Sequence, residues 1–197
     1  MPKVSEQHRV ARQDEIIEAA LTAFRRKGFQ ATSMAEIISE SGMSAGAIYG
    51  YFDSKTEIVH AVATRIVRAR VEDLDNLAQL DPMPEPSIMI RTLLSGLIDS
   101  LGLPAILLQV WGEAVTDPTL RELCVGIFGS LRDAMTLYVA RWQQSAHGLS
   151  VVDAQRVARE QAPLFVSVVN GFVVQDSLVP GFDRASFLDE TLPHLPR

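Results

Sequence analysis

The chain has 197 residues, a formal net charge of −6 and a hydrophobic share of 47%. This length holds one large domain or two small ones, and this hydrophobic share excludes a chain disordered by composition. No apolar run reaches the roughly 18 residues of a membrane span, and the polar N-terminus has no signal-peptide core, so we expect no membrane partner. The single cysteine, Cys124, excludes an internal disulfide framework and favours a cytoplasmic location. We interpret it as a small buried side chain, with a redox sensor as the less favoured alternative.

The charge is unevenly divided along the chain. Residues 1–70 hold ten Lys or Arg and eight Asp or Glu, a net of +2, whereas residues 71–197 hold eight and sixteen, a net of −8. A basic N-terminal part is what a footprint on nucleic acid requires. An excess of two charges is small, so this distribution is supporting evidence only.

An amphipathic helix is predicted from about Val10 to Lys27. Its apolar stripe, at helical spacing, consists of Ile17, Ala20, Leu21 and Phe24. Gly28 suits the left-handed position after the helix, which lets Phe29 fold back onto Phe24. Partners for this stripe are expected from the next two helices, namely Ile37, Ile38, Ile48 and Phe52.

A short helix from Met34 to Ser41 follows. Ser33 precedes it as an N-cap, and Glu36 stands three residues later, which completes a capping-box pattern. Gly42 comes directly after the helix and accepts a positive φ, so the chain can turn sharply there.

A second short helix is predicted from Ala45 to Tyr51, with Ser44 as its cap. Ser54 and Glu57 repeat the capping-box pattern and open a longer helix. A helix, a glycine turn and a short second helix are the parts of a helix-turn-helix.

A larger set of residues stands at fixed offsets between about Arg12 and Val62. These are Ile16-Ile17-Glu18-Ala19-Ala20, Phe24, Lys27-Gly28-Phe29, Thr32-Ser33-Met34, Ile37, Gly42-Met43-Ser44, Ile48-Tyr49, Tyr51-Phe52 and Ser54-Lys55. This run, about a quarter of the chain, resembles the N-terminal domain of the TetR family of bacterial transcriptional regulators. The resemblance implies an all-α protein with a DNA-binding head in residues 1–54, a linking helix over 55–80 and a dimerising, effector-binding body over 81–197.

The resemblance also implies which residues meet DNA. The helix Ala45 to Tyr51 would enter the major groove, and a set of hydroxyl, small and basic residues would touch bases or phosphates: Thr32, Ser33, Ser44, Ala45, Gly46, Tyr49, Tyr51 and Lys55. For Tyr49 and Tyr51, packing in the protein is the alternative. The family often carries larger side chains where Gly46 and Gly50 stand here. Specificity is therefore expected to lean on DNA shape or on three basic residues near the N-terminus, Lys3, Arg9 and Arg12.

The rest of the chain predicts helices and no strands, about nine helices in all. The segments are 55–80, 86–101, a buried helix over 103–115, 118–146, 150–178 with a kink or interruption at Pro163, and a last helix after Asp183. Along 55–80 the exposed charges change from basic to acidic, so this helix joins the two parts mechanically.

A dimer is expected because one short recognition helix reads too few base pairs, whereas two read a pseudo-palindrome. The residues assigned to the dimer interface are Leu164, Val168, Gly171, Phe172 and Phe187, and about half of this surface is expected to be internal core instead. An apolar effector pocket is assigned to Met89, Leu107, Trp111, Phe128, Phe165 and Asn170. For each of these, core packing is the alternative.

Enzyme motifs are missing from the sequence. The four histidines are scattered, without metal-ligand spacing, and there is no phosphate loop or nucleophile elbow, so we expect no metal, no cofactor and no catalysis. The predicted function is a DNA-binding transcriptional regulator, in particular a repressor released by a small, largely apolar effector. An architectural or partner-controlled DNA-binding protein is the alternative, and a cavity in the body would discriminate between the two.

Overall fold

The computed structural model describes residues 6–102 and 104–197. Within them the chain is all-α, as predicted, with no strand. The elements are α1 (Glu6–Lys27), α2 (Met34–Ser41), α3 (Ala45–Tyr49), α4 (Lys55–Leu77), α5 (Pro86–Leu101), α6 (Ala105–Ala114), α7 (Pro118–His147), α8 (Val151–Leu178) and α9 (Arg184–Ser186), then a π turn (Phe187–Thr191) and a 3₁₀ turn (Leu192–His194).

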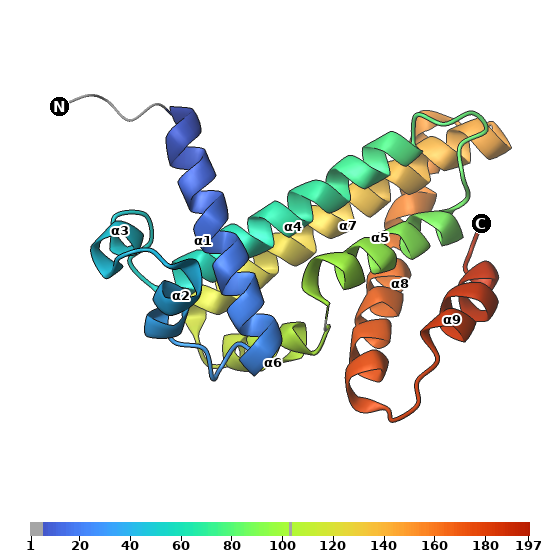
Figure 1. Ribbon diagram of the computed structural model, residues 1–197. Helices are drawn as coiled ribbons and strands as arrows, with labels where there is room; N and C mark the ends of the chain where they lie inside the picture. The colour runs from blue at the N-terminus through green and yellow to red at the C-terminus, as the bar shows by residue number, and fades with distance from the viewer. Residues whose placement is uncertain (1–5, 103) are drawn as a thin grey trace.

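The molecule is elongated along α4 and α7, which run side by side (Figure 1). The head, α1 to α3, lies at the N-terminal end of α4. The body runs from α5 to the C-terminus: α8 packs along α7, α5 packs on α4, and the final turn packs on α5. The helix that leaves the head is therefore also part of the scaffold of the body.

Several helix boundaries differ from the sequence prediction. The recognition helix α3 ends at Tyr49 and not at residue 51, because the chain turns at Gly50. The helix predicted over 103–115 begins at Ala105, while Leu103 lies outside the described residues. It is not the buried helix we predicted: only Ile106 and Ala114 are buried in it. α8 passes through Pro163 as one helix, without the predicted interruption.

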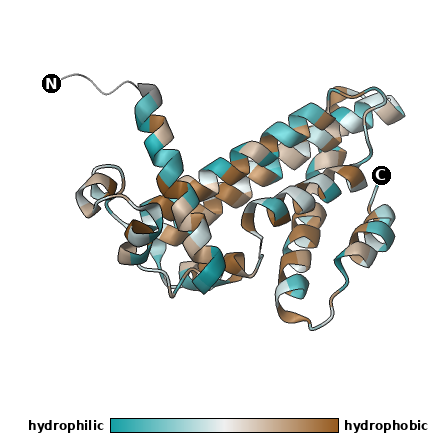
Figure 2. Ribbon diagram, in the orientation of Figure 1, coloured by the Kyte–Doolittle hydropathy of each residue, from teal (hydrophilic) through white to brown (hydrophobic). Residues whose placement is uncertain are grey.

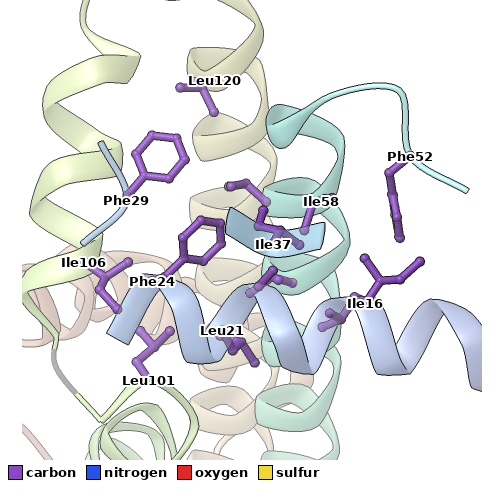
Figure 3. Close-up of a cluster of buried hydrophobic side chains, with 14 of the residues drawn as sticks. Ile16, Leu21, Phe24, Phe29, Ile37, Phe52, Ile58, Leu101, Ile106 and Leu120 are labelled. Carbon is purple, nitrogen blue, oxygen red and sulfur yellow. The ribbon is translucent and has the colours of Figure 1, made fainter. Parts of the chain in front are cut away.

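One cluster of buried side chains joins the head to the body (Figure 3). All the core residues predicted for the head belong to it. It continues through α4 into the body, with these further members: Ile58, Val59, Val62, Leu101, Ile106, Ala114, Leu120 and Cys124. The two short helices cannot cover the stripe of the longer α1 alone. The predicted boundary after residue 54 is therefore not a break in packing.

A second cluster fills the far part of the body, where the apolar sides of the helices face one another (Figure 2). Its centre is a group of three rings: Phe172 lies 5.6 Å from Phe182 and 5.2 Å from Phe187 between ring centroids. Tyr138 is 2% exposed, and its hydroxyl donates a 2.8 Å hydrogen bond to the Pro84 carbonyl. Burial raises the pKa of Tyr138 to about 12, so this hydroxyl stays protonated as a donor.

By composition, α7 is apolar enough to cross a membrane, with a mean hydropathy of 1.3 over an 18-residue window. In the structure it packs against α4, α6 and α8. Its buried side chains include Leu120, Met135 and Val139. This is the position of a core helix, for which the same composition is ordinary.

Candidate nucleic-acid interface and ligand cavity

The helix-turn-helix is built by local capping. Ser33 Oγ accepts from the Glu36 backbone N–H, and Glu36 Oε2 accepts from the Ser33 N–H at 2.8 Å, so the predicted capping box is present. A hydrogen bond from Lys27, followed by that from the Ser33 N–H, lowers the pKa of Glu36 to about 2. Gly42 then turns the chain with φ of 66°. The turn fixes the angle at which α3 leaves α2.

The second capping box is only half formed. Ser54 Oγ accepts from the Glu57 N–H at 3.2 Å, as predicted. The Glu57 carboxylate accepts from the Asp53 N–H at 2.7 Å, one residue earlier than a capping box requires. α4 therefore begins at Lys55, as the sequence predicted, with a longer carboxylate loop over its first turn.

α3 presents a bare surface to solvent. Ile48 is fully buried and anchors the helix, while the opposite side is exposed and consists of Ser44, Ala45, Gly46, Tyr49 and Gly50. Tyr49 is 49% exposed, and open space surrounds Gly46. A helix with so few protruding side chains can bring its backbone close to a groove.

Thr32 differs from its predicted position. It is 1% exposed, and its hydroxyl donates to the Gly28 carbonyl at 2.7 Å. The hydroxyl thus stabilises the loop between α1 and α2 and faces no solvent. This corrects the expectation of a phosphate contact at Thr32, whereas Ser33 beside it is exposed.

Lys55 and Tyr51 are half-buried. Lys55 Nζ donates to the Phe29 carbonyl at 3.1 Å and lies 4.3 Å from the centre of the Phe29 ring. This cation–π contact ties the start of α4 to the end of α1. Tyr51 packs against the core cluster and lines a surface depression together with Arg12 and Ser44. That depression brings a guanidinium, a hydroxyl and a phenol to one edge of α3.

A cavity of about 130 Å³ lies where the head meets the body. The head and α4 line it with Phe24, Phe29, Val62 and Ile66, and the body with Leu107, Trp111, Phe128 and others. Trp111 and Phe128 stack obliquely with centroids 5.6 Å apart. Cys124 lines the wall as a buried thiol, and burial raises its pKa. The wall is thus apolar and shared by both parts of the molecule.

Comparisons with known proteins show which proteins share this architecture. Residues 16–62 match the family model described as bacterial regulatory proteins, tetR family. A regulator from Syntrophomonas wolfei, solved as a TetR-family protein, superposes with a TM-score of 0.73 at 14% identity, covering 93% of this chain and 92% of that one. Residues 16–62 therefore correspond to the N-terminal domain of the tetR family, and the chain as a whole shares the fold of this neighbour.

Curated relatives of this chain are named transcriptional regulators. The HTH-type regulator YfiR of Bacillus subtilis is 41% identical over 40% of this chain, and TtgR of Pseudomonas putida is 33% identical over 55%. The matched segments span 38% and 45% of those proteins, less than half of their length. A regulator from Saccharomonospora viridis, solved in complex with choline, has a TM-score of 0.62 at 22% identity, with 94% of both chains covered.

Four of the six residues assigned to the effector pocket line the cavity. Leu107, Trp111, Phe128 and Asn170 line it. Met89 and Phe165 do not: both are fully buried in the second cluster. Hydrophobicity and helical phase did not distinguish the four lining residues from the two buried ones, because both sets face inward. Only the spacing between the helices leaves a gap beside the first set.

The residues assigned to the dimer interface also divide into buried and exposed ones. Phe172 is fully buried, which corrects its assignment, whereas Phe187 packs on its ring but is half-buried, so its place in an interface stays a prediction. Leu164 is 44% exposed, and Val168 and Gly171 are half-buried. Leu178 was not assigned to this interface; it is 68% exposed, and its spacing from Leu164 and Gly171 places it on the same side of α8.

Two polar contacts tie the head to the body. Gln109 Oε1, on α6, accepts from the backbone N–H of the buried Phe29 at 2.7 Å. Arg25, on α1, donates to the carbonyls of Leu101, at 3.2 Å, and Ser100 at the end of α5. Sequence reasoning singled out neither residue. Both contacts lie beside the cavity, since Phe29 and Leu101 line it.

The residues that the structure describes contain no group of three or more His, Cys, Asp or Glu side chains placed to hold a metal ion.

Proposed function

We propose that this chain is a cytoplasmic, homodimeric transcriptional repressor that binds pseudo-palindromic duplex DNA and is released by a small, largely apolar effector. The observation that carries the DNA-binding part is the exposed, nearly bare face of α3 on a capped helix-turn-helix. A two-fold dimer would present two such helices about 34 Å apart, one turn of DNA.

Contact with DNA would divide between two kinds of group. Ser44, Ala45, Gly46 and Tyr49 would approach the base edges, and the depression formed by Arg12, Ser44 and Tyr51 would hold a phosphate. Arg9 is exposed on α1 and is a candidate for the minor groove, while Lys3 lies outside the described residues. Because α3 carries few long side chains, much of the specificity would come from DNA shape.

The cavity supports a ligand-responsive regulator over an architectural or partner-controlled one. A filled core would favour the latter. Here the gap lies between Phe24 and Phe29 of the head and Leu107 and Trp111 of α6. A ligand that enlarged it would push the head away from α6 and tilt α4, which changes the spacing of the two heads. A structural neighbour was solved in complex with choline, which supports the proposal of a small-molecule ligand.

The DNA-binding proposal is tested with purified protein and sheared genomic DNA of its host. We expect recovery of discrete fragments, with an affinity that falls as salt rises. Tyr49→Ala should weaken binding about 10-fold or more, the size of one good base or phosphate contact. Leu80→Ala, exposed at the far end of the linking segment, is the control and should bind normally. Failure of the protein to bind any duplex at low salt would refute the proposal, and a reporter behind a recovered fragment distinguishes repression from activation.

The Gln109 contact leads to a second expectation. Gln109→Leu leaves the buried Phe29 N–H without an acceptor, so the free energy of unfolding should fall by about 1–3 kcal/mol. Urea denaturation followed by circular dichroism measures it. Gln155→Leu on the exposed side of α8 is the matched control and should change stability by less than about 0.5 kcal/mol. Equal stability of the two variants would show that Gln109 does not hold the head in place.

A further inference from the structure

Arg70 is a charged residue in the apolar cavity. It lies on α4, its side chain is 13% exposed, and it lines the cavity together with Asn170 and otherwise apolar neighbours. Nη2 pairs with Asp73 Oδ2 at 3.0 Å. Nε and Nη1 are buried and have no hydrogen-bond partner. A buried donor without an acceptor is costly, so an acceptor in the cavity toward which these N–H groups could turn would stabilise them.

The neighbouring helix has a recess for this guanidinium. A Cβ at Gly96 of α5 would lie 1.5 Å from Arg70 Nη1 and 2.2 Å from Cζ. Any other residue at position 96 would therefore displace the group. Leu97, beside the glycine, also lines the cavity. Nε and Nη1 therefore face α5 in this structure, and the guanidinium has to turn away from Gly96 to meet an acceptor in the cavity.

The rest of the cavity suits a hydrocarbon. Phe24, Phe29 and Trp111 contribute aromatic surface, and about 130 Å³ is close to the size of engineered apolar cavities of roughly 150 Å³ that hold one benzene molecule. A guanidinium prefers carboxylates among small organic acceptors, because its planar N–H groups match their oxygens. Asp73 pairs with Nη2 alone, so the two buried donors stay free for a ligand once the guanidinium turns toward the cavity.

We propose that the effector class is a small apolar carboxylate, with its carboxylate on Arg70 and its hydrocarbon among Phe24, Phe29 and Trp111. This rests on the proposed function for the consequence of binding, but the binding itself is a separate property. The ligand accepts hydrogen bonds from the unpartnered side of the guanidinium and fills the gap between head and body. Carboxylate recognition thereby sits on α4, the helix that carries the head.

The test measures binding directly, by calorimetry on the purified full-length protein without DNA. The probes are hexanoate, hexanol and hexylamine, which share a chain length and differ in the head group, together with butanoate and octanoate for size. Wild-type protein is expected to bind at least one carboxylate, and to prefer it over its alcohol by about 10-fold or more, the size of a charge-assisted hydrogen bond. The amine should bind most weakly.

Arg70→Met keeps an unbranched side chain and removes its donors, so the preference for the carboxylate over the alcohol should vanish while the alcohol still binds. Arg68→Met makes the same change two residues away on the exposed side of α4, and the preference should persist. Equal binding of alcohol and carboxylate to the wild type, or no binding of any carboxylate, would overturn the proposal. An Arg70-dependent preference with no effect on DNA affinity would instead refute the switch while leaving the site intact.

Discussion

Phe172→Ala is expected to lower the free energy of unfolding by about 3–5 kcal/mol. The side chain is fully buried, and its ring contacts Phe182 and Phe187, so truncation leaves a cavity at the centre of the second cluster. Chemical denaturation at one fixed protein concentration measures the loss, because a dimer's stability depends on concentration.

Val152→Ala on the same helix is the matched control for Phe172→Ala. Val152 is 75% exposed, so its truncation should cost less than about 0.5 kcal/mol. If Phe172→Ala instead left stability unchanged and only weakened self-association, Phe172 would be an interface residue, as the sequence first indicated, and the packing described here would be wrong.

The double variant Leu164→Glu with Leu178→Glu is expected to convert a dimer into monomers. Both side chains are exposed in the single chain, and they share one side of α8 with Val168 and Gly171 at a spacing of four and three residues. Such a seam is suited to a second copy of α8, and the small glycine allows close approach. Burying two carboxylates without partners in it would be strongly unfavourable.

Loss of the dimer should weaken binding to a two-site operator by about 100-fold or more, because the second head no longer binds at high effective concentration. Analytical ultracentrifugation reports the mass, and fluorescence anisotropy reports DNA affinity. Val152→Glu adds a carboxylate to α8 away from the seam and should remain dimeric with normal DNA binding. A dimeric double variant would show that the copies meet through another surface.

Local sequence was sufficient for the helix-turn-helix. The capping box at Ser33 and Glu36, the turn at Gly42 and the start of α4 at Lys55 were all predicted, since each depends on residues within four positions of one another. The exposed face of α3 followed from the burial of Ile48 alone. Helical periodicity likewise predicted most of the other helices, because it depends only on spacing.

Other assignments needed the packed molecule. Thr32 and Ser33 are adjacent hydroxyl residues, yet only the fold of the α1–α2 loop decides that one is buried and the other exposed. Met89 and Trp111 are both inward-facing apolar residues, but only Trp111 borders a gap. The sequence shows which side of a helix is apolar and gives no information on what covers that side.

The sequence by itself determined an all-α chain with a capped helix-turn-helix and a linking helix. Tertiary structure alone decided that head and body share one core, that the cavity lies at their junction and that Arg70 reaches it opposite Gly96. The physical reason is the separation along the chain of the residues on which each feature depends. Caps, turns and amphipathic faces arise from neighbours along the chain, whereas a cavity and a buried charge depend on distances between helices that are far apart in sequence.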